Sequence, residues 1–195
     1  MAMYMVGRAY LDKYLLSEKF NSSVTSLGLG NDDSEDIRPT LAKATEWLEK
    51  AKSRGVKKDA IDDHLAICYM NYGSLYQKRG KEIWRDERVC GYEKAIEWYS
   101  KVENIGIENK DAAEVEGFNR AEICLGQCYA EMGRYPEARK YFRKAVEDYG
   151  DYDAIPEFCK YLNEADQMRW LKEVKELNEK FITKYTTKNP HIYPS

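Results

Sequence analysis

Residues 121–150 read AEICLGQCYAEMGRYPEARKYFRKAVEDYG, and this segment predicts two helices joined by a tight turn. Gly133 is a natural C-terminal breaker for the first helix, and Pro136 fits the first turn of the second helix, which Gly150 closes. The second helix carries the i, i+3, i+4, i+7 spacing of a buried stripe at Ala138, Tyr141, Phe142 and Ala145. Two helices joined by so few residues must lie antiparallel, so the segment predicts a helical hairpin.

The same signature occurs three times along the chain. A glycine is followed by a tyrosine three residues later, at Gly7/Tyr10, Gly73/Tyr76 and Gly126/Tyr129. A downstream alanine then has an aromatic residue three positions later, at Ala44/Trp47, Ala95/Trp98 and Ala138/Tyr141. A small or branched residue stands seven positions after each alanine, at Ala51, Val102 and Ala145. Repetition of this kind predicts stacked hairpins that bury one continuous core.

These residues resemble the tetratricopeptide repeat. The third block matches the order and spacing of that family at Leu125, Gly126, Tyr129, Gly133, Tyr135, Ala138, Phe142 and Ala145. It departs from the family pattern at Glu122, where a tryptophan is expected, and at Gly150, where a proline is expected. Residues 72–106 resemble a sister family, the Sel-one-like repeat, through Ala95-Ile96-Glu97-Trp98-Tyr99-Ser100-Lys101. The resemblance implies an all-α fold, a right-handed superhelix of about four antiparallel hairpins forming a tetratricopeptide-like solenoid.

The domain organisation follows from these blocks. We expect a single domain over residues 1–186 and a tail at 187–195, with hairpins at about 2–55, 58–106, 111–150 and 153–186. Residues 17–36 are rich in Ser, Asn, Asp and Gly, which is typical of a flexible loop. Residues 81–91 form an insertion in the second hairpin and predict an inserted loop. In the fourth hairpin we expect helices at 154–164 and 167–185.

Composition limits the class of partner and the compartment. A net charge of -3 with interspersed signs gives no overall attraction to nucleic acid or to an anionic membrane. The sequence has no apolar run of the roughly 18 residues that a membrane span needs. Residues 1–6 are apolar but lack the basic region of a signal peptide. The five cysteines are an odd number on mainly helical segments, which favours reduced thiols in the cytoplasm.

Catalytic and metal-binding patterns are weak. Cys124 and Cys128, like His64 and Cys68, are four residues apart and would share a helix face, as ligands of one metal can. Small cysteines packed between helices are the reading that we favour, so no metal and no cofactor is expected. Residues 23–30 lack the Gly-Lys-Ser/Thr ending of a phosphate loop. No catalytic Ser-His-Asp or Cys-His order is present, and we predict that the chain is not an enzyme.

The resemblance places a binding groove on the inward face of the first helices. Projected onto this sequence, its polar positions are Tyr4, Arg8, Asp12, Asn71, Ser74, Gln77, Lys78, Arg120, Gln127 and Glu131. Chaperone-binding members of the family clamp two carboxylates with Lys, Asn, Asn, Lys and Arg. The corresponding positions here are Tyr4, Arg8, Asn71, Arg120 and Cys124, so a full clamp is not expected. Arg8, Asn71, Lys78 and Arg120 remain candidates for holding a carboxylate or phosphate.

The sequence therefore predicts a cytoplasmic adaptor or scaffold that binds a peptide segment of a protein partner in this groove, without nucleic acid or membrane. Two alternatives stay open. One is a structural homo-oligomer that assembles through the apolar N-terminal edge at residues 1–6. The other is a regulatory helical domain of an enzyme complex whose catalytic chain lies elsewhere.

Overall fold

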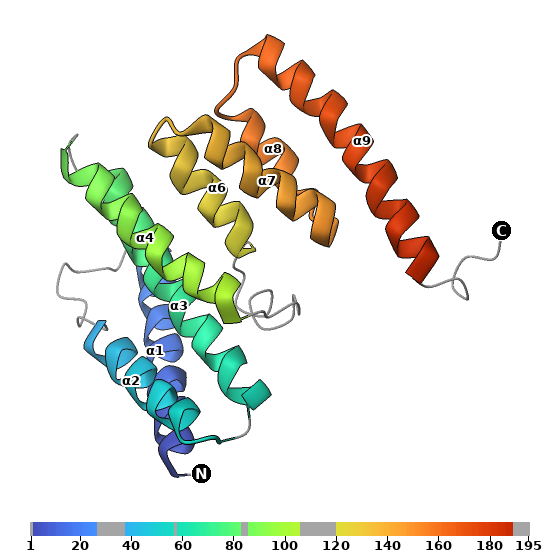
Figure 1. Ribbon diagram of the computed structural model, residues 1–195. Helices are drawn as coiled ribbons and strands as arrows, with labels where there is room; N and C mark the ends of the chain where they lie inside the picture. Colours follow the sequence, from blue (N-terminus) through green and yellow to red (C-terminus); the bar gives the residue numbers. More distant parts are fainter. Residues whose placement is uncertain (1, 27–37, 57, 83–85, 106–119, 189–195) are drawn as a thin grey trace.

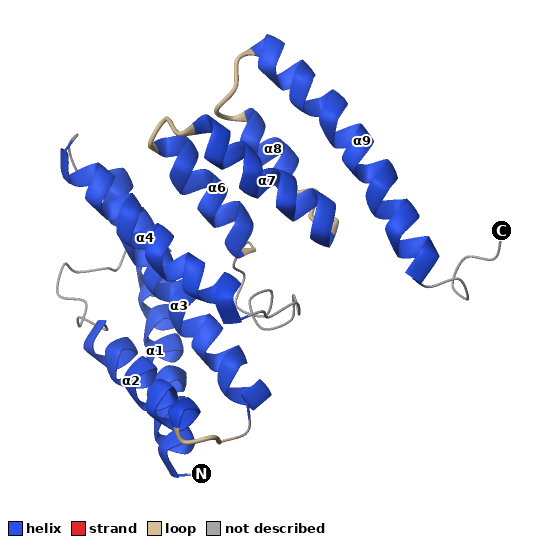
Figure 2. Cartoon of the chain, viewed as in Figure 1, coloured by secondary structure: helices blue, strands red, loops and turns tan. Residues whose placement is uncertain are grey.

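The computed structural model describes residues 2–26, 38–56, 58–82, 86–105 and 120–188. Every regular element within these ranges is an α-helix, as Figure 2 shows. In the order of Figure 1, the helices are α1 (Ala2–Ser26), α2 (Arg38–Ser53), α3 (Lys58–Glu82), α4 (Asp86–Ile105), α6 (Ala121–Glu131), α7 (Tyr135–Tyr149), α8 (Ala154–Cys159) and α9 (Glu164–Lys188). Among them, no helix is both long and apolar enough to cross a membrane.

Consecutive helices pair and the pairs stack. Helix α1 packs against α2, α3 against α4, and α6 against α7. The second helix of each pair then packs against the first helix of the next, so that α2 contacts α3, α4 contacts α6, and α7 contacts α8. Figure 1 shows α1 and α9 at opposite ends of the resulting stack. The predicted all-α stack of antiparallel hairpins is confirmed.

Each signature glycine marks the place where the two helices of a hairpin approach most closely. A Cβ atom on Gly73 would lie 2.3 Å from the ring of Tyr99, far inside van der Waals contact. A Cβ atom on Gly126 would lie 2.8 Å from Phe142, and one on Gly7 would lie 2.9 Å from the side chain of Leu48. All three contacted residues stand four positions after the alanine of the signature. The three hairpins therefore close in the same register.

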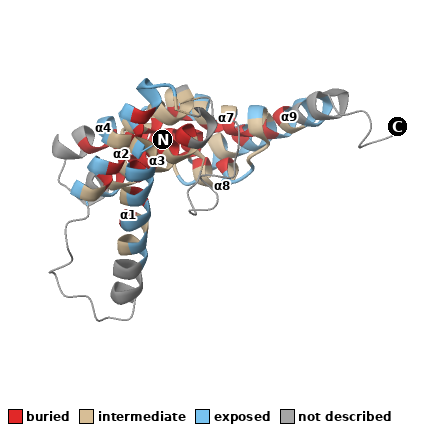
Figure 3. Cartoon of the chain, turned by 90° about the horizontal axis from the view of Figure 1, so that it is seen from below, coloured by how far each residue is buried: buried red, intermediate tan, exposed pale blue. Residues whose placement is uncertain are grey.

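The core runs through the stack between these contacts (Figure 3). The signature residues Ala44, Ala95 and Ala138 are completely buried. The third hairpin is joined to the last one by a row of aromatic rings. Phe142 stacks on Phe158 with ring centroids 4.9 Å apart, and Phe158 meets Trp170 edge-on at 5.2 Å. Because all three rings are buried, they hold α7, α8 and α9 together.

The turns of the third hairpin follow the sequence prediction. Gly133, after α6, has φ 74°, and Gly150, the C-cap of α7, has φ 64°. Both values lie in the left-handed region that glycine enters without the steric cost of a Cβ atom. Pro136 stands in the first turn of α7. The two glycines therefore end helices where the sequence indicated.

The predicted flexible loop at 17–36 is wrong over its first half. Helix α1 continues to Ser26, while residues 27–37 lie outside the described part of the chain. The polar composition of 17–26 suggested a loop, but the segment contains no proline or glycine that would end a helix. The helix therefore continues through polar residues.

The predicted inserted loop at 81–91 is also wrong for most of its length. Helix α3 reaches Glu82 and α4 begins at Asp86, with 83–85 outside the described residues. Lys, Glu and Arg predominate in this segment, and all three have high helix propensity. The additional residues therefore lengthen two helices.

The last hairpin divides earlier than predicted. Helix α8 ends at Cys159, and α9 begins at Glu164. Asn163 explains the new start because its Oδ1 accepts a hydrogen bond from the backbone N–H of Asp166 at 2.9 Å. This is an N-cap, which satisfies a backbone donor that has no partner within the helix.

Substitution of Gly73 by alanine tests the close helix contact. We expect Gly73→Ala to lower the free energy of unfolding by about 1–3 kcal/mol, because the new methyl group overlaps the Tyr99 ring. This loss opposes the gain of roughly 0.5–1 kcal/mol that alanine brings to a helix interior. Urea denaturation measures the difference. The control Lys78→Ala, an exposed site on the same helix, should change stability by less than about 0.5 kcal/mol. A more stable Gly73→Ala protein would contradict the packing argument.

Candidate functional site

A chain of hydrogen bonds, here called the polar ladder, starts on α4 and connects α3, α6 and α8. The Tyr99 hydroxyl donates to Gln77 Oε1 at 2.8 Å, and Gln77 Nε2 donates to Gln127 Oε1 at 3.1 Å. Gln127 Nε2 then donates to Glu157 Oε2 at 2.7 Å. Each amide accepts on one side and donates on the other, so the polarity runs in one direction across the hairpins. The polar ladder thus brings together two projected groove residues, Gln77 and Gln127.

The two ends of the ladder are closed differently. At one end, burial raises the pKa of Tyr99 well above its ordinary value, which keeps the hydroxyl protonated and able to donate. At the other end, Glu157 forms an ion pair with Lys160 one turn later. The projected residue Glu131 lies nearby and accepts a hydrogen bond from the Tyr161 hydroxyl at 3.1 Å. Burial and the nearby Glu131 carboxylate raise the pKa of Tyr161 as well.

The projected residues in the first two hairpins are more open to solvent. Tyr4 packs edge-on against the His64 ring with centroids 5.6 Å apart, which joins α1 to α3. Arg8 and Asp12 form an exposed ion pair with a 3.8 Å separation between Nε and Oδ2. Ser74 is half-buried and Lys78 is exposed. The exposed charges of the projected face therefore lie on α1 and α3.

Two further projected residues, Asn71 and Arg120, also make contacts within the chain. Asn71 is buried, and its side-chain amide donates to the backbone oxygen of Ile67 at 2.8 Å. The Arg120 guanidinium lies 3.8 Å above the Tyr149 ring, and its Nε is 3.6 Å from Asp151 Oδ2. The side chains of Arg120 and Asp151 are only 10% and 13% exposed. Arg120 therefore already holds a carboxylate of its own chain, and the proposed set of four anion ligands is reduced to Arg8 and Lys78.

Sequence reasoning did not find Glu157 or Tyr161. Both residues lie in or next to α8, which belongs to the hairpin without a glycine signature. Without that glycine there was no reference position from which to project the inward face of α8. Tyr99 was not among the predicted site residues, although a tyrosine at the position of Leu48 and Phe142 adds a hydroxyl to that core position. A buried hydroxyl requires a partner, and this requirement is the signal that could have indicated the ladder.

The cysteines of the two predicted pairs pack in the core. Cys68, Cys124 and Cys128 are buried, the last two beside Leu125 and Tyr92. Burial raises the pKa of Cys68 and of Cys124 to about 12 from an ordinary value of 9.0, which disfavours the thiolate that a metal requires. Within the described ranges, no three His, Cys, Asp or Glu side chains are arranged to hold a metal ion.

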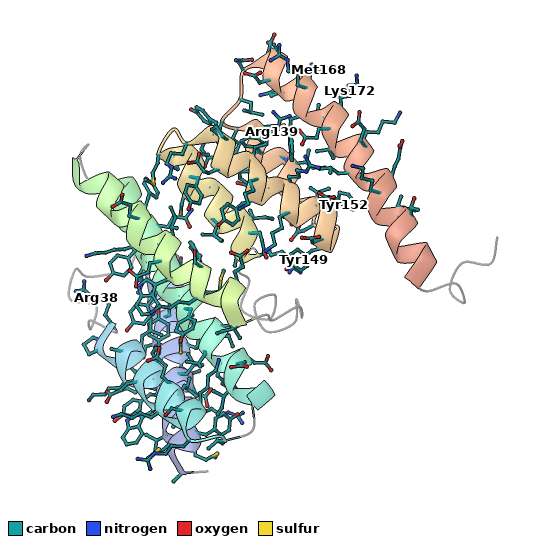
Figure 4. The ribbon with its side chains drawn as sticks, viewed as in Figure 1. Arg38, Arg139, Tyr149, Tyr152, Met168 and Lys172 are labelled. Carbon is teal, nitrogen blue, oxygen red and sulfur yellow. The ribbon has the colours of Figure 1, made fainter. Side chains whose placement is uncertain are left out.

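A pocket of about 680 Å³ lies between α7, α8 and α9, at the edge where their turns meet. Its wall consists of aromatic and apolar side chains with a polar rim, contributed by Tyr135, Pro136, Arg139, Phe158, Tyr161, Leu162, Asn163, Asp166 and Trp170. Phe158 and Trp170 are buried and form its floor, so the accessible surface comes from the remaining residues. The Arg139 side chain (Figure 4) reaches Glu173 on α9, with Nε donating to Oε2 at 2.8 Å.

Comparison with known families agrees with the geometry of α6 and α7. The family model described as tetratricopeptide repeat matches residues 120–152, which span both helices and their glycine turn. Residues 120–152 are a tetratricopeptide repeat. No curated protein and no solved structure matches the chain. The tetratricopeptide repeat supports a general role in binding other proteins, whereas the Sel-one-like character of residues 72–106 stays a prediction.

Arg120 offers a test of whether the projected groove cation is structural. We expect Arg120→Gln to lower the free energy of unfolding by about 1–3 kcal/mol, because it leaves Asp151 poorly solvated and removes the contact with Tyr149. Thermal and urea unfolding measure the loss. Arg120→Lys retains the charge and should lose less. Unchanged stability of Arg120→Gln would show that the ion pair contributes nothing.

The buried thiols predict lower stability at alkaline pH. Because the folded pKa of Cys68 and Cys124 is raised to about 12, their contribution to stability is complete below pH 9 and is lost as the pH rises from 9 to 12. We expect the free energy of unfolding to fall by on the order of 2 kcal/mol for each of the two thiols between pH 8 and pH 10.5. Urea titrations at both pH values measure this fall. Cys124→Ala removes one titrating group and should show a smaller fall, whereas an equal fall would contradict the assignment.

Proposed function

We propose that the chain is an adaptor that binds an extended segment of another protein along the inward face of its first helices. The observation that carries this proposal is the polar ladder, which aligns side-chain amides of successive hairpins beside the exposed charges of α1 and α3. Gln127 is half-buried, and beyond its two ladder bonds its amide keeps a second N–H and further acceptor capacity, which suit the backbone of an extended peptide whatever its sequence. Tetratricopeptide repeats in general bind proteins, which supports the same conclusion.

The charges along this face favour a particular kind of segment. Arg8 and Lys78 supply exposed positive charge on α1 and α3, although Arg8 has Asp12 beside it. Glu131 and Glu157 supply negative charge on α6 and α8. A segment with acidic residues at one end and basic residues at the other would complement this arrangement. Such complementarity sets binding orientation and rate more than it sets affinity.

The alternatives are unequal in support. Self-assembly is favoured by a separate observation, the exposed apolar side chains of the two terminal helices, and is developed below. A regulatory domain of an enzyme complex has no observation of its own in its favour.

A matched pair of lysine reversals in one hairpin tests the inward face. Lys78 lies on the first helix α3, and Lys94 lies on the second helix α4 above the Tyr76 ring. Both are exposed, so Lys78→Glu and Lys94→Glu change the net charge equally. We expect Lys78→Glu to weaken binding of the partner segment about tenfold, because it repels the acidic end, while Lys94→Glu leaves binding nearly unchanged.

The measurement has two stages. Affinity capture with the wild-type chain identifies candidate partners, and fluorescence anisotropy with a labelled synthetic segment gives Kd for the wild type and both variants. Circular dichroism confirms that the variants retain wild-type helicity. A segment that binds Lys78→Glu as tightly as wild type, or that loses affinity only for Lys94→Glu, would show that the partner binds elsewhere.

A further inference from the structure

Exposed apolar side chains are concentrated on the two helices at the ends of the stack. Among the described residues, eight large apolar side chains are exposed, and six of them belong to α1 or α9. These six are Met5, Val6 and Leu16 on α1, and Met168, Leu171 and Ile182 on α9. Figure 1 places the two helices at opposite ends, so one cannot cover the other within the same chain.

The exposed face of α1 corresponds, counted from the signature glycine, to a face of α6 that is buried inside the stack. Counted from the signature glycine, positions −5, −2, −1 and +2 of α6 are Ala121, Cys124, Leu125 and Cys128. All four are buried, in the stack where α6 meets α4. The same positions of α1 are Ala2, Met5, Val6 and Ala9, which are equally apolar but exposed. Helix α1 therefore presents the kind of face that a preceding second helix covers elsewhere in this chain.

The outer faces of α1 and α9 match in spacing and in chemistry. On α9, the positions 171, 175, 179 and 182 are Leu, Lys, Glu and Ile, in steps of four, four and three. On α1, the positions 16, 12, 8 and 5, read backwards, are Leu, Asp, Arg and Met, with the same steps. Steps of three and four keep residues on one helix face, and a common rise per residue keeps two antiparallel helices in register.

We propose that α9 of one copy packs antiparallel against α1 of a second copy, so that the chain assembles head to tail. Leu171 then meets Leu16, and Ile182 meets Met5 at the other end of the contact. Between these apolar pairs, Lys175 lies opposite Asp12 and Glu179 lies opposite Arg8, so the assembly engages these two projected groove charges of α1 and leaves Lys78 of α3 to a partner segment. The exposed fractions of the four apolar side chains, from 45% for Leu171 to 69% for Leu16, leave a large surface to bury.

The assembly resembles the packing within the chain in joining a later helix to a first helix, although on α1 it shares only Met5 with the set of positions that is buried on α6. Within one copy, each second helix packs against the first helix of the following hairpin, as α2 does against α3 and α4 against α6. Helix α9 is the last helix of the described stack and packs against α7 as well as α8, and α1 is the first helix of the stack. Figure 4 shows Lys172 on the side of α9 that faces away from α7, where the second copy would bind. A head-to-tail contact of this type gives an open chain or a closed ring.

Symmetric pairing of identical helices fits less well. An antiparallel contact of α1 with α1 that joins Met5 to Leu16 places Arg8 opposite Lys13, which are like charges. The corresponding contact of α9 with α9 joins Leu171 to Ile182 and places Lys175 opposite Asn178, so that register forms no ion pair. Only the head-to-tail register combines two apolar pairs with two ion pairs.

Sedimentation velocity of the full chain at increasing concentration provides the first test. A contact between two single helices is small, so we expect association in roughly the micromolar range, with the mass rising above the 22.8 kDa of one chain. Met5→Glu/Leu16→Glu blocks α1, and Leu171→Glu/Ile182→Glu blocks α9. Each variant alone should remain monomeric. The control Lys43→Glu/Lys94→Glu changes exposed lysines of second helices and should assemble as wild type does.

Mixing the two blocked variants decides the geometry. Each keeps one intact face, so an equimolar mixture should form a dimer and nothing larger, through α9 of the first variant and α1 of the second. All four substituted positions are exposed, so we expect both variants to fold, and circular dichroism checks this. A wild-type chain that stays monomeric at several hundred micromolar overturns the proposal. So does a blocked variant that still self-associates, because a symmetric contact would then use the intact face.

Discussion

The close approach of two helices at a glycine is the constraint on which the rest of the structure depends. At Gly73 the missing Cβ leaves room for the Tyr99 ring, and this contact fixes where the ring ends. One turn after Gly73 stands Gln77, whose side-chain oxygen accepts the hydrogen bond from the Tyr99 hydroxyl. The polar ladder across α3, α6 and α8 therefore starts from a packing contact inside one hairpin. The absence of a Cβ atom at Gly73 thus helps to position Gln77 on the candidate binding face.

Many polar side chains of the inward face make their hydrogen bonds and ion pairs with other groups of the same chain. Asn71 bonds the backbone of its own helix, and Arg120 is held between Asp151 and the Tyr149 ring. The Asn71 bond satisfies a buried amide that would otherwise cost about 1–3 kcal/mol. The ion pair and the ring contact of Arg120 offset part of the cost of burying its charge. These contacts leave partner recognition to fewer side chains, among which Lys78 on α3 is exposed. Specificity then depends on a small number of charges that are presented by a preorganised surface.

Local residues were sufficient to predict the hairpins, because the reasons for them are local. Gly133, Gly150 and the Ala138 stripe each carry a backbone or packing requirement that can be recognised within a few positions. Arg120 could not be assigned, since its partner Asp151 lies beyond a whole hairpin in sequence. Residues 17–26 were misassigned because polar residues occur both in loops and on exposed helices. The last member of the ladder, Glu157, stands in a helix without a signature, and therefore no register could place it.

Helix α8 has consequences for the order in which the molecule folds. It spans only Ala154–Cys159, well below the length at which an isolated helix is stable in water. Its stability comes from Phe158, which is enclosed between Phe142 of α7 and Trp170 of α9. Helix α8 thus has no nucleus of its own and must form on a hairpin of α6 and α7 that already exists. In a stack that is stabilised between neighbours, we expect this end to assemble outward from the tetratricopeptide repeat and to unfold first at α9.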